Sequence, residues 1–343
     1  MTRIPSSVAL RLVRIGEEIR RTPPLADEFK AYTARMLVMA TLPHSDPGDV
    51  PVWQRENGWF TLTIHPTTDK TGRRLYPSGS IPRLVLYWLV TEAVRTGSRR
   101  IDLGPSLAEF LRKVGLDPAT GGGKRGDARR LGNQLHRLFN AQIRIVDGLE
   151  SKPFQTRSLT MTVVEFSDLW WTATTMNQRS LFGNYLILGD AFFREVTSHS
   201  FPVDRRALEA LRRRPLALDL YAWLSYRIRA LQGGTLKLSW KLIADQLGAS
   251  YANPNDFSKA AREALRMIKA VYPGLNYDCP NGRLTILPSR PAVPGKNRRI
   301  TQVVHGETLP FATANDTGAF RDISPTGHGE TLLVQTVKRS HNL

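Results

Sequence analysis

Residues 215–248 read PLALDLYAWLSYRIRALQGGTLKLSWKLIADQLG, and this stretch decides the fold. It predicts an apolar helix at Pro215–Leu231, because proline suits a first helical turn and the glycine pair that follows ends the pattern. A short strand is predicted at Thr235–Leu238. Ser239 then stands where it can cap a second helix, Lys241–Leu247.

The residues that follow complete this unit. After a polar loop, the period of the apolar residues predicts a helix at Asp256–Tyr272. Leu275–Tyr277 and Arg283–Leu287 flank Asn281-Gly282, a dipeptide that strongly favours a β-hairpin. Helix, strand, helix, helix and hairpin is the order of a winged-helix domain, which the sequence predicts over residues 202–290.

The same order occurs earlier in the chain. The sequence predicts a helix at Arg83–Thr96, a strand at Arg100–Leu103, and two helices at Leu107–Val114 and Asp127–Asn140. Two strands follow, at Gln142–Val146 and Thr156–Glu165. Leu86-Tyr87-Trp88-Leu89 in the first apolar helix also matches Leu220-Tyr221-Ala222-Trp223-Leu224 in the second. The sequence therefore predicts an α+β protein with two tandem winged-helix domains related by internal duplication.

Five segments are expected along the chain. N-terminal helices and an irregular lead-in occupy residues 1–74, the first winged-helix domain 75–166, a connector 167–201, and the second domain 202–290. Residues 291–343 have little periodicity and are rich in polar residues, glycine and proline, so a flexible C-terminal tail is expected.

The composition indicates the chemical class of the binding partner and the cellular compartment. Lys and Arg number 48 against 30 Asp and Glu, a net charge of +18, which favours a polyanionic partner. Cys279 is the single cysteine, so an internal disulfide is excluded and a reducing compartment is suited. No signal peptide and no apolar run of ~18 residues is evident. A cytoplasmic protein without membrane contact is expected.

The predicted helix Asp256–Tyr272 has two distinct faces. At 100° per residue its apolar residues fall on one side, and a cationic stripe about 80° wide lies beside them. Such a helix can seat on its domain and present basic groups to a DNA groove. A solvated surface is the alternative interpretation. The predicted DNA-binding residues here are Lys259, Arg262, Arg266 and Lys269, with Arg283 at the tip of the following hairpin.

The helix Asp127–Asn140 repeats this pattern in the first copy. Leu131, Leu135, Leu138 and Phe139 are expected to be buried, and the polar residues are expected to point away. Arginine and asparagine suit guanine and adenine edges, and a helix start favours phosphate. The predicted DNA-binding residues are Lys124, Arg125, Arg129, Arg130, Asn133 and Arg137.

Motifs for catalysis were sought among the polar residues, and none fits. The glycine-rich residues 120–125 lack the spacing of a phosphate loop, because Pro118 and Arg125 stand where glycine and Ser or Thr are needed. The seven histidines form neither a His-x-His pair nor a zinc helix, and no acidic cluster suggests a two-metal site. We therefore expect a non-enzymatic protein without cofactor, metal or catalytic residue.

Several strings resemble a known family. Residues 76–84 (YPSGSIPRL), 91–96 (TEAVRT), 103–111 (LGPSLAEFL), 202–204 (PVD) and 215–224 (PLALDLYAWL) are similar to RepA-type plasmid replication initiators. The resemblance runs from about residue 50 to Pro291. It implies an initiator that binds repeated double-stranded sites at a plasmid origin, helps to open the duplex and recruits the host replication initiator and helicase. It also implies that a homodimer can form.

Two other functions remain open at this point. A winged-helix transcriptional repressor without initiator activity fits the same duplicated modules. A nickase or primase is the enzymatic alternative, and the missing histidine pair and acidic cluster argue against it.

Overall fold

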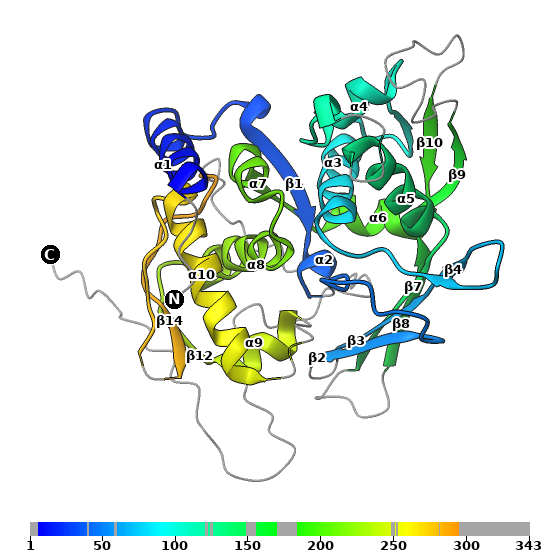
Figure 1. The fold of residues 1–343 in the computed structure, drawn as a ribbon. Helices are drawn as coiled ribbons and strands as arrows, with labels where there is room; N and C mark the ends of the chain where they lie inside the picture. Colours follow the sequence, from blue (N-terminus) through cyan, green and yellow to red (C-terminus); the bar gives the residue numbers. More distant parts are fainter. Residues whose placement is uncertain are drawn as a thin grey trace, which may run out of the picture.

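The structure is a computed structural model that describes residues 6–39, 41–57, 60–120, 123, 126–148, 156–169, 184–247, 251, 253–280 and 282–294. It is a mixed α+β fold with small antiparallel sheets (Figure 1). The α+β class that the sequence predicted is therefore confirmed. The predicted tail is described only as far as residue 294, and residues 295–343 lie outside the described part.

The second half of the chain has the predicted order of elements. Helix α8 (Pro215–Leu231) leads to strand β12 (Leu236–Ser239) and helix α9 (Trp240–Leu247), and the Ser239 hydroxyl accepts a hydrogen bond from the Leu242 amide at 3.2 Å. Helix α10 and the hairpin strands follow, at Pro254–Val271 for α10, Tyr277–Asp278 for β13 and Arg283–Ile286 for β14. The sheet order is β12-β14-β13.

The first half begins with the same elements. They are α3 (Ser80–Thr96), β6 (Arg100–Asp102), α4 (Leu107–Lys113) and α5 (Asp127–Phe139), with a short 3-10 turn at Pro118–Thr120. Ser106 caps α4 by accepting a hydrogen bond from the Glu109 amide at 3.3 Å. Gly97 ends α3 in the left-handed region with φ 62°.

The hairpin of this half differs from the prediction. Strands β7 (Gln142–Gly148) and β8 (Thr156–Thr162) do not pair with β6. They form a four-stranded sheet, β2-β3-β7-β8, with strands from the lead-in, Trp53–Asn57 for β2 and Phe60–His65 for β3. The pairing follows from register, since the apolar pairs Leu62 with Ile145 and Ile64 with Ile143 meet across β3 and β7.

The partner of β6 comes from the predicted connector. The run expected at residues 156–165 changes sheets at buried Val163, and β9 (Val164–Asp168) begins there. Strand β10 (Tyr185–Leu188) lies between β6 and β9, so this sheet has the order β6-β10-β9. The predicted strands of residues 142–165 therefore do pair as a hairpin, but this hairpin joins β3 and not the sheet of β6, because strand periodicity does not identify a distant partner.

The two halves are joined by an antiparallel strand pair. Strand β1 (Lys30–Ala34) pairs with β11 (Ser200–Asp204), so that Tyr32 lies opposite Pro202. Helix α1 (Ser6–Arg21) precedes β1, and the short α2 (Arg35–Met39) follows it. Helix α6 (Asp190–Ser198) precedes β11, and α7 (Arg205–Leu211) follows it.

The helices that lead into this pair lie on opposite halves. Helix α1 packs against α10 and α7 of the second half, whereas α6 packs against α3 and β8 of the first (Figure 1). Both dockings depend on a glycine. A Cβ at Gly16 would lie 1.8 Å from the carbonyl oxygen of Ala270, and one at Gly189 would lie 2.2 Å from that of Thr162. The backbones therefore touch directly at both points.

The apolar helices α3 and α8 form the centre of the core, since most of their residues are buried. Trp88 packs edge-on against Phe110 at a centroid distance of 5.1 Å. Trp223 is 1% exposed, and its indole donates a hydrogen bond to the Gln246 side chain at 3.0 Å. Both tryptophans are therefore buried in the core.

The second half extends slightly beyond its predicted end. Val293 is 1% exposed, and the Arg290 carbonyl accepts a hydrogen bond from the Tyr272 hydroxyl at 2.8 Å. Residues 289–293 thus pack on the helix α10 end of this half, although the sequence placed the tail from residue 291.

Candidate nucleic-acid interface

Local sequence determines where helix α10 begins, and its apolar side determines how it packs. The Asn253 side chain accepts a hydrogen bond from the Asn255 amide at 2.9 Å, and Pro254 occupies the first turn. The predicted inward residues are all buried, namely Phe257, Ala261, Ala264, Leu265 and Ile268. The helix is therefore held against its half by the face that the periodicity predicted.

The predicted cationic stripe lies on the outside of α10, since Lys259, Arg262, Arg266 and Lys269 are exposed. Lys259 is 78% exposed and lies 3.4 Å from the Asp256 carboxylate one turn earlier, an exposed pair that binds weakly. Lys269 differs from the others, because its ammonium group donates to the carbonyls of Pro273 and Leu275. Lys269 thus closes the helix end as well as carrying charge outward.

Arg262 is oriented by an aromatic ring of the preceding helix. Its guanidinium carbon lies 5.6 Å from the ring centroid of Trp240, the first residue of α9. Trp240 itself is buried and meets Phe257 edge-on at 6.5 Å. A cation over an aromatic face contributes about 0.5–1 kcal/mol at an exposed site, so the ring restrains Arg262 without covering it.

The hairpin after α10 carries the last predicted residue. Gly282 has φ 70°, its carbonyl accepts a hydrogen bond from the Trp240 amide at 3.3 Å, and Arg283 is exposed at the start of β14. Trp240 thus ties the hairpin to the start of α9. Asn281 lies outside the described residues.

Helix α5 also has a buried apolar side and an exposed polar side, although not every predicted residue lies on the expected side. Leu131, Leu135, Leu138 and Phe139 are buried, and Arg129, Arg130 and Asn133 are exposed. Arg130 lies 3.2 Å from the Asp127 carboxylate, whose side chain is buried at the helix start. Gly132 lies in open space, because an added Cβ would meet nothing within 4 Å.

Three predicted residues near α5 need separate comment. The sequence predicted that Arg137 points away from the protein, and this prediction is wrong. Arg137 is 19% exposed and donates to the Asp46 carboxylate at 2.7 Å and to the Tyr76 carbonyl at 3.1 Å. These partners come from a loop far away in sequence, so helical periodicity alone does not reveal them. Lys124 and Arg125 lie outside the described residues.

A buried ionic network joins α3 to α8 between the two basic helices. Arg83 donates to both carboxylate oxygens of Asp219, at 2.7 and 2.8 Å, and to the carbonyls of Leu42, Pro43 and Gly79. The His44 ring lies 2.8 Å from the same carboxylate. The side chains of Arg83 and Asp219 are 4% and 6% exposed.

Burial and charge act on this network in opposite ways. Burial tends to raise the pKa of Asp219, but Arg83 and His44 outweigh it and hold that pKa below its usual value. Burial lowers the pKa of His44, so the ring is neutral near pH 7. Burial also lowers the pKa of nearby Arg55 to about 9, although its guanidinium donates to the Asp245 carbonyl and the Thr41 hydroxyl.

Sequence reasoning missed this network, although one signal for it was present. Arg83 and Asp219 each stand within a strongly apolar helical run, where an unpaired charge is costly. A charge of each sign in two apolar helices indicates a pair between them. The His44 contribution has no comparable signal in the sequence.

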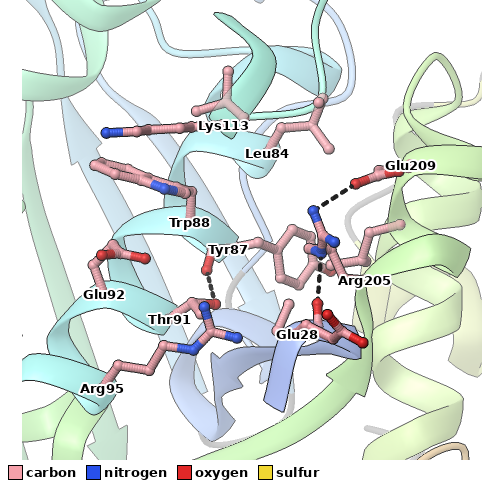
Figure 2. Close-up of a pocket in the computed structure, with 14 residues that line it drawn as sticks. Glu28, Leu84, Tyr87, Trp88, Thr91, Glu92, Arg95, Lys113, Arg205 and Glu209 are labelled. Carbon is pink, nitrogen blue, oxygen red and sulfur yellow. Dashed lines mark hydrogen bonds and ion pairs between the residues drawn. The ribbon is translucent and has the colours of Figure 1, made fainter. Parts of the chain in front are cut away.

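A cavity of about 350 Å³ lies at another edge of the junction, between α3, the end of α4 and α7 (Figure 2). Tyr87, Trp88 and Thr91 line one side of it. Arg205 lies opposite and donates to the Glu209 carboxylate at 3.3 Å and to the Glu28 carbonyl at 2.9 Å. The polar group that faces the cavity from α7 is therefore bonded within the protein.

Two properties of the described residues bear on other functions. They contain no group of three or more His, Cys, Asp and Glu side chains that is placed to hold a metal ion. None of the described helices is long and apolar enough to cross a membrane.

Comparison with known proteins gives one match. Residues 76–241 match the family described as plasmid-encoded RepA protein. This range runs from the residues just before α3 into the start of α9, so α10 lies beyond it. Neither the curated proteins nor the solved structures give a match. Residues 76–241 are therefore similar to the plasmid-encoded RepA proteins, and the resemblance to RepA-type plasmid replication initiators that the sequence indicated is confirmed over this range.

Proposed function

We propose that this chain acts as a plasmid replication initiator by binding repeated double-stranded DNA sites at the origin, with α10 in the major groove. One observation supports this most. Helix α10 is the third helix of the unit that begins with α8, its apolar side is buried, and Lys259, Arg262 and Arg266 are exposed together along its outside. A helix seated in this way can place arginine against guanine edges.

The proposal includes two winged-helix modules related by duplication. In the second half the first strand pairs with the last strand of the hairpin, in the order β12-β14-β13. The first half has the corresponding order β6-β10-β9, with β7 and β8 as an added hairpin in another sheet. The wing of the first module is then β9-β10 rather than the predicted β7-β8.

Helix α5 makes the second DNA contact in this proposal. Arg129, Arg130 and Asn133 are exposed and suited to base edges and phosphates. Arg137 supports α5 from behind through Asp46 and Tyr76. It therefore acts as a positioning residue and not as a DNA contact.

Binding alone performs the proposed function, without a chemical step. The family supports a role in replication, and duplex opening, recruitment of the host initiator and helicase, and formation of a homodimer are parts of the proposal. A repressor without initiator activity is separated from it by supplying the protein in trans to a plasmid that carries only the origin. Failure of that plasmid to replicate, with DNA binding intact, would favour the repressor.

The decisive binding experiment uses a double variant of α10. R262A/R266A is compared with K70A/R73A, which also removes two exposed cations but from the hairpin of β4 (Thr67–Thr68) and β5 (Arg74–Leu75) in the first half. We expect R262A/R266A to lose about 1–3 kcal/mol per base-contacting arginine and to discriminate less between origin repeats and scrambled DNA. The control is expected to keep that discrimination. Equal behaviour of the two variants would refute the role of α10.

A further inference from the structure

Four arginines from α1 and from the residues just after α7 lie close together in the fold. Arg11 of α1 donates to the carbonyl of Ala210 at 2.9 Å across a sequence separation of 199 positions. Arg212 and Arg213 follow directly after α7, and Arg212 donates to the Gly115 carbonyl at 2.9 Å. The cluster formed by Arg11, Arg14, Arg212 and Arg213 is here termed the arginine patch.

The charges of the patch are not neutralised by neighbouring acids. Three carboxylates on the neighbouring helices face other arginines, since Glu18 faces Arg206, Glu209 faces Arg205 and Glu263 faces Arg214. Glu17 follows Arg14 by three residues in α1 and forms no ion pair within the described residues. Within the described part of the chain, no ion pair involves Arg11, Arg14, Arg212 or Arg213. Burial, followed by repulsion from Arg212, Arg213 and Arg14, lowers the pKa of Arg11.

Folding brings these like charges together at an energetic cost, which a bound polyanion would reverse. Arg14 and Arg213 are exposed, so an anion can reach them. Neither side chain has a hydrogen bond within the described residues that would explain its position as structural support. The patch therefore has the chemistry of a phosphate contact.

The place of α1 relates the patch to the proposed DNA helix. Gly16 of α1 touches the backbone of Ala270 in the last turn of α10. Arg14 precedes Gly16 by two residues, about 3 Å along the helix axis and about 160° around it, so Arg14 lies on the side of α1 that faces away from the contact with α10. On the helical wheel of α10, Ala270 falls within about 20–40° of Lys259 and Arg266, the residues of the exposed stripe. Helix α1 thus crosses the C-terminal end of the same side that carries the cations.

We infer that the arginine patch binds backbone phosphates of the DNA that α10 contacts, just beyond the C-terminal end of that helix. This inference rests on the proposed function. It adds a contact that positions the DNA without reading its sequence, because phosphates are the same in every sequence. An acidic protein segment is the alternative occupant, and the experiment below distinguishes it.

The test measures binding to an origin repeat and to scrambled DNA from 50 to 200 mM salt. The variant is R14Q/R213Q, and K70Q/R73Q is the control with the same change in charge on the first half. Each lost phosphate contact flattens the slope of log K against log salt by about 0.9, so a change of about 1.8 is expected. The affinity that wild-type protein loses over this salt range should then fall by roughly tenfold in the variant.

Three accompanying results are expected. R14Q/R213Q weakens binding to both DNAs alike, its melting temperature is unchanged or higher because repulsion is relieved, and the slope of the control changes by clearly less. Equal changes in the variant and the control would overturn the inference, since they would reflect net charge alone. An unchanged slope together with lost replication in cells would also overturn it and assign the patch to an acidic protein partner.

The two proposals fail in different ways. If R262A/R266A loses discrimination while R14Q/R213Q binds like the wild-type protein, the patch inference alone is wrong. If neither variant alters DNA binding, the proposed function is wrong as well.

Discussion

Replacement of Asp219 by asparagine tests whether the buried pair joins the two halves. The change keeps the shape of the side chain but removes the charge that Arg83 meets at 2.7 and 2.8 Å. Arg83 stays buried at 4% exposure, with three carbonyls but no anion beside it. Removal of one partner from such a pair costs about 3–5 kcal/mol. At about 2–4 °C per kcal/mol, the melting temperature is expected to fall by roughly 6–20 °C.

The pH dependence of D219N gives a second measurement. Because the pKa of Asp219 is depressed in the folded protein, its contribution is fully present above the unfolded value of about 4. The contribution is lost as pH falls through the lower folded pKa. The gap in unfolding free energy between the wild-type protein and D219N should therefore be constant at neutral pH and shrink below about pH 4.

The matched control is E209Q. Glu209 pairs with Arg205 at 3.3 Å, but the two side chains are 42% and 49% exposed, so at most about 1 kcal/mol is expected. Denaturant unfolding at pH 7 measures both variants. If D219N costs no more than E209Q, the reasoning about the buried pair is wrong.

Four other predictions follow from the described geometry. Burial lowers the pKa of His44, so His44 takes up a proton in the unfolded chain before it does so in the folded protein as pH falls below about 6.5. The stability of the wild-type protein should therefore decline in this range, and that of H44Q should decline less. Melting curves between pH 7 and 5 measure the difference. G16A should detach α1 and lower the melting temperature, whereas G132A, which has open space around it, should gain up to ~1 kcal/mol of stability. A G16A protein that is more stable than G132A would disprove the close contact at Gly16. R262A should cost ~1–3 kcal/mol of DNA affinity and relax preference at one base position, with an unchanged melting temperature, in competition binding. Truncation after residue 294 should leave DNA binding and stability intact, but truncation after residue 288 should lower the melting temperature, because it removes buried Val293; equal melting temperatures would contradict that packing.

The second half was predictable because its signals are local. Pro215, Ser239 and the Asn281-Gly282 dipeptide mark element ends within a few residues, and helical periodicity identified the buried side of α10. The same periodicity placed Lys259 and Arg262 outside. These features depend on the preferences of neighbouring residues, which a sequence carries directly.

The first half was only partly predictable, because its strand pairing is non-local. Strands β7 and β8 have the alternation of a hairpin, but alternation does not reveal that β7 pairs with β3, about 80 residues earlier. The same limit applies to side chains. Arg137 turns toward Asp46, and Arg11 meets Arg212, through tertiary packing that no spacing in the sequence encodes.

The antiparallel pair of β1 and β11 has a consequence for how the protein behaves as a whole. The second half needs α1 from the other end of the chain, and β1, which packs on α3 of the first half, pairs with β11 of the second, so neither half has all its contacts when expressed alone. The molecule should therefore melt in one cooperative transition, unlike two modules tethered by a linker. The distance between α5 and α10 is then fixed by the fold before any ligand binds. A ligand that contacts both helices therefore does not have to bring them into position.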